Sequence, residues 1–273
     1  MTNSLLSGRR VVVTRSRAQA SGLVDRLAGL GATVVELPVI AIGDPADGGV
    51  ALSNAARRLT DGAYQWVAVT SANAASRLFA ALDGRVVPAT VRWAAVGAVT
   101  ARILDEAGFP PALVPGESMS EALAEAFPAA IPGHPISPAG IPGNAPTVLF
   151  PRAETVRGAL APELRAKGWV VDEVIAYRTM ADDPGPDAVA AARRADAIVF
   201  TSSSTVDQAT ALLTPDGMPP VVASIGPITS NSVRAAGLQV AVEASVHTVE
   251  GLVDALVSAL GARPASGAQS PAE

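Results

Sequence analysis

The sequence predicts an α/β protein in which two similar lobes each hold a parallel sheet covered by helices. Short apolar runs alternate with helical spacings along the chain, which is typical of parallel strands joined by crossover helices. An internal repeat is the second observation: Ser71 recurs as Ser202, 131 residues later, and Gly97 recurs as Gly226, 129 residues later. Two related halves that end their strands in hydroxyl and glycine turns predict a cleft between two lobes.

Each half begins with the same group of elements. Residues 10–14 form a short β-branched run, and leucines then recur at helical spacing over 18–30. Gly31 ends this helix as a C-terminal cap. Arg15, Gly31 and Glu36 recur 137 residues later as Arg152, Gly168 and Glu173. Both halves are therefore expected to start with a strand and a helix.

The rest of each half continues the alternation. A strand-like run over 33–42 contains Pro38, which places it at an edge or in a connection. In the first half we expect strands over 66–70, 92–96 and 112–115, and helices over 50–59, 74–82, 100–107 and 120–127. In the second half we expect strands over 147–150, 170–179, 197–201, 221–225 and 239–242, and helices over 153–166, 187–194, 205–213, 230–236 and 249–260. Ligands of such sheets bind at the carboxyl ends of the strands.

Two segments lack the apolar spacing of a core element. Residues 128–146 carry six prolines among few apolar anchors, which predicts a solvated linker or a surface insertion. Residues 263–273 are mainly Ala, Pro, Ser and Gly, and we expect them to form a disordered tail.

Composition excludes several classes of function. The chain has 273 residues, enough for two domains, and 49% are hydrophobic. Its net charge is −5 and no basic stripe occurs, which argues against nucleic acid as a partner. There is no cysteine and no apolar run long enough for a membrane helix. Because a strand-like run begins by Val11, we expect no signal peptide. We expect a cytoplasmic protein and, from its low charge and lack of a long apolar stripe, a monomer.

The usual catalytic and metal motifs are missing. The only histidines are His134, in the proline-rich segment, and His247, which we expect to be exposed polar residues. Asp182-Asp183 precedes Pro184 and is typical of a turn rather than a metal site. No phosphate-binding loop occurs. We therefore expect no histidine triad, no metal and no cofactor.

Hydroxyl-rich turns that precede helices are the candidate site. Ser, Thr and Asn are the preferred helix caps, so capping alone can explain one such turn. The alternative is anion binding, because the first N–H groups of a helix lack partners within it. Several such turns facing one cleft would hold a polycarboxylate. The candidate residues are Thr70, Ser71, Asn73, Gly97, Thr100, Ser202, Ser204, Gly226 and Thr229.

Three further side chains have two possible roles each. Arg15 and Arg152 end the first strand of each half, where each is either solvated or a contact for a carboxylate. Tyr177 lies near the end of the long strand-like run over 170–179. Its ring either packs in the core, or its phenol donates a proton or a hydrogen bond to a leaving hydroxyl.

At these residues the sequence resembles the uroporphyrinogen-III synthase family over about residues 9–260. The likeness rests on Val13-Thr14-Arg15, Thr70-Ser71-x-Asn73, Val96-Gly97-x-x-Thr100-Ala101, Tyr177-Arg178-Thr179, Phe200-Thr201-Ser202-x-Ser204 and Ile225-Gly226-x-x-Thr229. Each motif is short, and their order and spacing carry the specificity. The resemblance implies lobes at 1–37 plus 180–262 and at 38–179, the latter with the insertion 128–146. A two-strand hinge at 37–42 and 173–180 would join them.

The resemblance also implies a reaction. The family cyclises hydroxymethylbilane to uroporphyrinogen III in tetrapyrrole (haem) biosynthesis, with loss of water and inversion of the last pyrrole ring. On this pattern Tyr177 assists departure of the hydroxyl, and the hydroxyl-rich turns contact acetate or propionate arms. Ser203 stands where many members have proline. No cofactor is implied, and a transient contact with hydroxymethylbilane synthase would deliver the unstable substrate.

The alternative from another class is a non-enzymatic two-lobed small-molecule binding protein. Such hinged proteins share two α/β lobes with crossing strands. The lack of a secretion signal and of a lipoprotein cysteine argues against the exported type. A regulator of this type carries a DNA-reading helix pair at its N-terminus, whereas here a strand-like run begins by residue 11.

Overall fold

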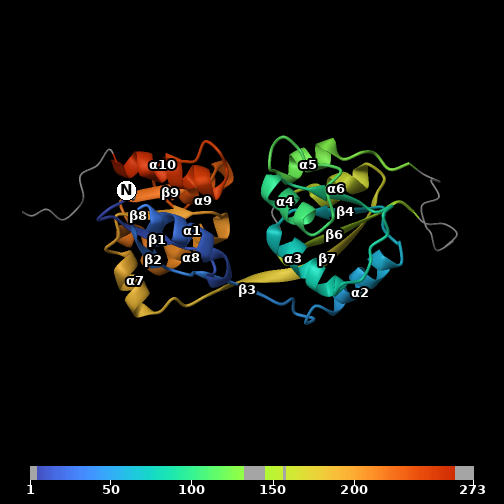
Figure 1. The fold of residues 1–273 in the computed structure, drawn as a ribbon, viewed down its shortest axis with the longest axis horizontal. Helices are drawn as coiled ribbons and strands as arrows, with labels where there is room; N and C mark the ends of the chain where they lie inside the picture. Colours follow the sequence, from blue (N-terminus) through green and yellow to red (C-terminus); the bar gives the residue numbers. More distant parts are fainter. Residues whose placement is uncertain (1–4, 132–144, 156–157, 262–273) are drawn as a thin grey trace, which may run out of the picture. The chain divides into compact units, whose positions relative to one another are not determined.

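The computed structural model describes residues 5–131, 145–155 and 158–261. The chain forms two compact units (Figure 1): unit 1 holds Met1–Ala41 and Met180–Glu273, and unit 2 holds Ile42–Thr179. It passes from unit 1 to unit 2 within β3 (Ile40–Gly43) and returns within β7 (Val170–Ala181). Most of the proline-rich segment, including His134, and the expected tail at 263–273 lie outside the described residues.

Unit 1 is a five-stranded sheet of order β10-β9-β8-β1-β2 in which every neighbouring pair is parallel. Its strands are β1 (Arg10–Val13), β2 (Thr33–Glu36), β8 (Ala197–Phe200), β9 (Val221–Ser224) and β10 (Val242–Glu243). Its helices are α1 (Arg17–Gly29), α7 (Pro186–Ala192), α8 (Ser203–Leu213), α9 (Pro227–Ala235) and α10 (Val249–Gly261), with a 3-10 turn at Pro215–Gly217. Val11 and Val13 pack under α1 and α10, whereas Val12 packs on the face of α7, α8 and α9. This alternation is that of a strand buried on both faces.

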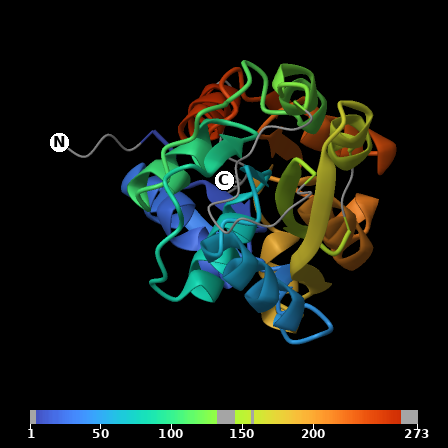
Figure 2. The same ribbon diagram turned by 90° about the vertical axis from the view of Figure 1, so that its right-hand side faces the viewer.

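Unit 2 holds the sheet of order β3-β7-β6-β4-β5, in which the pairs β7–β6, β6–β4 and β4–β5 are parallel. The remaining strands are β4 (Trp66–Val69), β5 (Arg92–Ala95) and β6 (Thr147–Ala153). One face is covered by α2 (Val50–Thr60), α3 (Ala72–Leu82) and α4 (Ala98–Glu106), and the other by α5 (Ser120–Ala126) and α6 (Leu160–Ala166). Figure 2, which faces unit 2, shows β7 as its long strand.

The parallel α/β class predicted from the sequence is confirmed, but four elements differ from the expectation. The strand expected over 239–242 is the two-residue β10, Val242–Glu243. The run over 33–42 is two strands, β2 and β3, with Pro38 between them. The helix expected over 153–166 begins only at Leu160, because β6 extends to Ala153 and pairs there with β7. The strand expected over 112–115 is a single bridge from Leu113 to Ala94, since the prolines around it lack the N–H that a ladder needs. Within the described ranges, no helix has the length and apolarity to span a bilayer.

Candidate functional site

The predicted site residues lie where parallel strands end and helices begin. In unit 2, Ser71 is the N-cap of α3 and follows β4, and Gly97 is the N-cap of α4 and follows β5. In unit 1, Ser202 is the N-cap of α8 after β8, and Gly226 is the N-cap of α9 after β9. Each unit therefore presents two helix starts at the carboxyl edge of its sheet, where the first N–H groups of a helix are available.

Ser71 and Tyr177 are brought together in unit 2. The Ser71 Oγ accepts a hydrogen bond from the backbone N–H of Ala74 at 3.1 Å, which caps α3. The same oxygen lies 3.2 Å from the Tyr177 hydroxyl, within hydrogen-bonding distance. The Tyr177 ring is buried near the end of β7, so its phenol is held in one position beside the start of α3. Tyr177 thus both packs in the core and offers a hydroxyl at the edge of the sheet.

The other three helix starts differ from that of α3. The N-cap residues of α4, α8 and α9 make no capping hydrogen bond through a side chain. In α8 the Ser202 Oγ instead lies 3.1 Å from the Ser204 Oγ and 3.4 Å from the Thr205 Oγ1. Capping by a side chain, the simpler explanation of these turns, therefore applies to Ser71 and not to Ser202. First-turn N–H groups that the N-cap residue does not cap suit the binding of an anion.

The two glycine N-caps are covered by equivalent loop residues. A Cβ on Gly97 would lie 2.2 Å from the Ser118 Oγ, and one on Gly226 would lie 3.0 Å from the His247 Cδ2. Ser118 and His247 are 129 residues apart, the same separation as the two glycines. His247 is exposed, as expected, but its ring lies on the start of α9. This pair was not predicted from the sequence, because Ser118 and His247 hold equivalent positions of the repeat but differ in residue type.

The first turns of α4 and α9 also expose apolar side chains. Thr100 and Thr229 are each only 5% exposed, so these two predicted contacts pack against the protein. Their neighbours Val99 and Ile228 are 47% and 53% exposed. These apolar residues also occupy equivalent positions of the repeat and were not among the predicted site residues. Each helix start therefore combines N–H groups that its N-cap residue leaves uncapped with one exposed aliphatic side chain.

The two predicted arginines are not equivalent. The Arg152 Nε lies 2.9 Å from the Glu173 Oε2, and its Nη1 donates to the carbonyls of Ala153 and Glu154. Arg15 has no ion pair among the described residues, and burial lowers the pKa of its guanidinium. Arg15 therefore lies at the carboxyl edge of its sheet without an ion pair and can bind an anion there. Arg152 is already bound to Glu173 and to two backbone carbonyls of unit 2.

The start of α9 is held by a buried hydroxyl chain. The Ser224 Oγ at the end of β9 lies 2.5 Å from the Ser230 Oγ, and Ser230 donates in turn to the Glu243 carboxylate. Ser224 and Ser230 are fully buried. Because this chain ties the helix to β9 and β10, it fixes the first turn of α9 relative to the sheet.

The remaining predicted residues add polar groups without forming a metal site. Thr70, Asn73 and Ser204 are half-buried beside the starts of α3 and α8. Asp182 pairs with Arg17 at 3.4 Å, as suits a turn residue. No group of three His, Asp or Glu side chains that could hold a metal ion occurs in the part of the chain that the structure describes.

Comparisons with known proteins identify the family. A family model described as "Uroporphyrinogen-III synthase HemD" matches residues 21–254. The uroporphyrinogen-III synthase of Synechococcus elongatus is 32% identical over 94% of this chain and 97% of its own length. The resemblance predicted from the sequence is thereby confirmed.

Two solved structures share the fold. A mutant uroporphyrinogen III synthase from the extremely thermophilic bacterium Thermus thermophilus aligns with a TM-score of 0.63 and 19% identity, covering 92% of this chain and 98% of that one. The uroporphyrinogen-III synthetase from Helicobacter pylori aligns with a TM-score of 0.56 and 16% identity, covering 92% and 99%. With the fold, the family match and the curated relative in agreement, this chain belongs to the uroporphyrinogen-III synthase (HemD) family.

Proposed function

We propose that this protein is a uroporphyrinogen-III synthase, a cyclising lyase of tetrapyrrole biosynthesis. Its substrate is hydroxymethylbilane, and its product is uroporphyrinogen III, formed with loss of water and inversion of the last pyrrole ring. The observation that carries this proposal is the similarity to a uroporphyrinogen-III synthase along 94% of the chain. The repeated helix starts at the carboxyl edges of both sheets support it, because they suit a substrate that bears eight carboxylates.

The first chemical step is loss of the hydroxyl group, which leaves an electrophilic azafulvene. We assign Tyr177 to this step, as donor of a hydrogen bond or proton to the departing hydroxyl. Its contact of 3.2 Å with Ser71 supports the assignment, since it orients the phenol, and the Ser71 oxygen is itself fixed by the Ala74 N–H. The substituted carbon of the last ring then attacks the azafulvene, and the spiro intermediate fragments and recloses in the inverted sense.

Most of the reactivity in these later steps belongs to the substrate, which also cyclises spontaneously to the uninverted isomer. The protein must therefore hold the chain of pyrroles in the geometry that leads to inversion. Positioning and fixed dipoles are sufficient for such steering, and neither requires a metal or an organic cofactor.

Binding of the carboxylates is assigned to backbone N–H groups and one arginine. The starts of α4, α8 and α9 offer N–H groups that their N-cap residues leave uncapped, and Arg15 adds a positive charge. The N-terminus of a helix carries about half a positive charge as a dipole, without changing the net charge of the protein. A chain of net charge −5 can bind a polyanion in this way.

The proposal also covers the division of the chain into lobes, the oligomeric state, the cellular compartment and the partner enzyme. The lobes at 1–37 plus 180–262 and at 38–179 are supported by the division of the chain at Ala41 and Thr179. The cleft, the two-strand hinge and the insertion at 128–146 stay predictions. We also propose that the enzyme acts as a monomer in the cytoplasm, and that it receives its substrate in a transient contact with hydroxymethylbilane synthase.

The test is the isomer that the purified protein forms. Hydroxymethylbilane is supplied with and without a metal chelator, and the oxidised porphyrins are separated by chromatography. We expect mainly type III in both samples. Type I alone, at the rate of a protein-free control, would refute the proposal and favour the non-enzymatic binding protein.

A further inference from the structure

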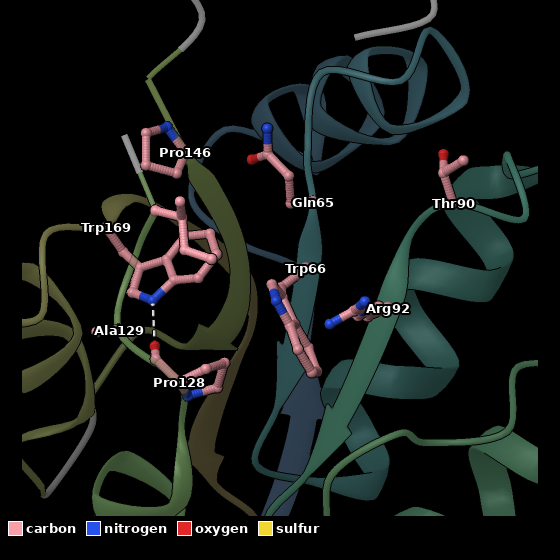
Figure 3. A pocket seen from close by; sticks show the side chains of 9 residues that line it. Gln65, Trp66, Thr90, Arg92, Pro128, Ala129, Pro146 and Trp169 are labelled. Atoms are coloured by element: carbon pink, nitrogen blue, oxygen red, sulfur yellow. Dashed lines mark hydrogen bonds between the residues drawn. The ribbon is translucent and has the colours of Figure 1, made fainter. Parts of the chain in front are cut away.

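A pocket lies at the amino edge of the sheet in unit 2, opposite the edge that carries Ser71 and Tyr177 (Figure 3). Its volume is about 150 Å³, and its lining includes Trp66, Arg92 and Trp169. Trp66 and Arg92 are the first residues of β4 and β5, and Trp169 immediately precedes β7. Since β4 is four residues long, the two edges of the sheet are about 13 Å apart. The pocket is therefore separate from the candidate functional site.

The aromatic walls of the pocket are fixed by the packing around them. Trp66 and Trp169 are only 6% and 8% exposed. The Trp169 Nε1 donates to the Pro128 carbonyl at 2.7 Å, as Figure 3 shows, so this indole cannot turn without losing the bond. The ring of Phe127 packs at 4.8 Å from Trp66 and edge-on at 5.9 Å from Trp169. Both indoles are thus preorganised, which lowers the cost of binding a flat ligand.

Arg92 adds a positive charge to these walls. Its guanidinium carbon lies 5.7 Å from the centre of the Trp66 ring, within the range of a cation–π contact. Nowhere in the described chain does a carboxylate pair with this arginine, and its side chain is exposed at the rim. A guanidinium that lies against an aromatic ring and keeps its N–H donors free suits a carboxylate.

We propose that the pocket formed by Trp66, Trp169 and Arg92 binds a small aromatic carboxylate with a single ring. A cavity of about 150 Å³ holds one benzene-sized ring, so a tetrapyrrole is too large for it. The ring lies against the indoles, and the carboxylate points to Arg92 at the rim. Pyrrole carboxylic acids belong to this class, as does benzoate. The inference does not depend on the proposed function, because it uses the other edge of the sheet.

The three tryptophans of the chain allow a direct test with an internal control. Trp93 lies on the opposite face of the sheet, where it stacks on Phe109 at 4.5 Å. Benzoate is titrated into the full chain while the three indole N–H signals are followed by NMR, with assignments from single Trp→Phe variants. We expect the signals of Trp66 and Trp169 to shift saturably and that of Trp93 to stay in place. The absence of a saturable shift, or an equal shift of all three signals, would overturn the proposal.

The role of the charge is tested with a matched pair of variants. Arg92→Met should weaken benzoate binding about three- to tenfold, a modest factor because the guanidinium is exposed. It should leave the binding of uncharged benzyl alcohol unchanged. Arg102→Met removes the same charge from an exposed position on α4 and should leave both affinities unchanged. Equal benzoate affinity in the wild type and in Arg92→Met would refute a carboxylate site. Formation of the type III isomer is measured separately, so the two proposals fail independently.

Discussion

Replacing Tyr177 by phenylalanine tests the chemical step, and the same change at Tyr64 is its matched control. These are the two tyrosines of the chain, and both belong to unit 2. The Tyr177 hydroxyl contacts Ser71 at the carboxyl edge of the sheet. The Tyr64 hydroxyl lies at the amino edge, where it donates to Asp172 and accepts from the Arg58 Nε at 2.9 Å. Each variant loses one hydroxyl from the same unit, at opposite ends of its strands.

Tyr177→Phe should reduce kcat much more than stability, because the hydrogen bond between Ser71 and the Ala74 N–H remains in the variant. Ser71 keeps its bond to the Ala74 N–H, so unfolding should become easier by only about 0.5–1.5 kcal/mol. A positioned proton donor accelerates a reaction by a factor of about 10²–10⁴. We expect a factor at the lower end of this range, because the substrate is itself reactive. We therefore expect kcat to fall about 100-fold without abolishing turnover. KM should change little, because the carboxylate contacts are untouched.

The control should show the reverse pattern. Tyr64→Phe removes two hydrogen bonds but leaves Asp172 paired with Arg58 at 2.7 Å, so stability should fall by about 1–2 kcal/mol. Turnover should stay at the wild-type value. Burial is the main cause that raises the pKa of the Tyr64 hydroxyl, and the neighbouring Asp172 carboxylate raises it further. The wild type therefore loses stability as the pH rises above about 10, where the unfolded tyrosine ionises, and the variant should lack this loss.

The assay measures initial rates of type III formation and urea unfolding on the same preparations. Wild-type turnover in Tyr177→Phe would remove this phenol from the mechanism. If both variants lost turnover in proportion to their loss of stability, the effect would be structural. That result would also refute the role of Tyr177 in loss of the hydroxyl.

Three further predictions follow from the helix starts. Gly97→Ala brings a Cβ to 2.8 Å from the Ser118 Cβ, so the loop must move and kcat/KM should fall about tenfold in steady-state assays. Ile228→Asp places a carboxylate beside a polyanion and should raise KM at least about tenfold, whereas Val86→Asp, at a position that is 84% exposed, should not. Asp47 accepts hydrogen bonds from the Ala51 and Gly49 N–H groups at the start of α2, which lower the pKa of its carboxyl group. Asp47→Ala should therefore lower stability at neutral pH, and in urea unfolding the difference should vanish as the pH falls through the lowered pKa.

The sequence predicted the layers of the fold because its signal there is local. Strands such as β4 and β8 are short apolar runs, and the turns after them hold the residue types that begin helices. The contact between Ser71 and Tyr177 was not predictable in this way. It joins residues 106 positions apart and depends on the pairing of β6 with β7, whose register shifts between Arg152 and Ala153. Nothing in the local sequence specifies that shift.

The repeat also predicted an equivalence that the structure does not keep. Arg15 and Arg152 occupy the same position of the repeat, and so do Glu36 and Glu173. Among the described residues, Arg152 and Glu173 form an ion pair, whereas Arg15 and Glu36 do not. The reason is strand length: β6 extends to Ala153, so Arg152 lies within the ladder beside β7, whereas β1 ends before Arg15. Likeness of sequence located the two arginines, but the extent of each strand determined which one stayed free.

A similar divergence distinguishes the two Thr-Ser turns. Ser71 caps α3 and contacts Tyr177, so its oxygen serves the helix and the phenol, while Ser202 leaves the first N–H groups of α8 free. On the proposed function this difference divides the work between the halves of the repeat. The turn before α3 orients the group that assists loss of the hydroxyl, and the turn before α8 binds a carboxylate. Because a backbone donor adds no charge, further turns of the second kind can collect the arms of an octacarboxylate on an acidic protein. The same reasoning explains why few arginines are needed. Arg15, which has no ion pair among the described residues, lies at the edge of the sheet that carries α8.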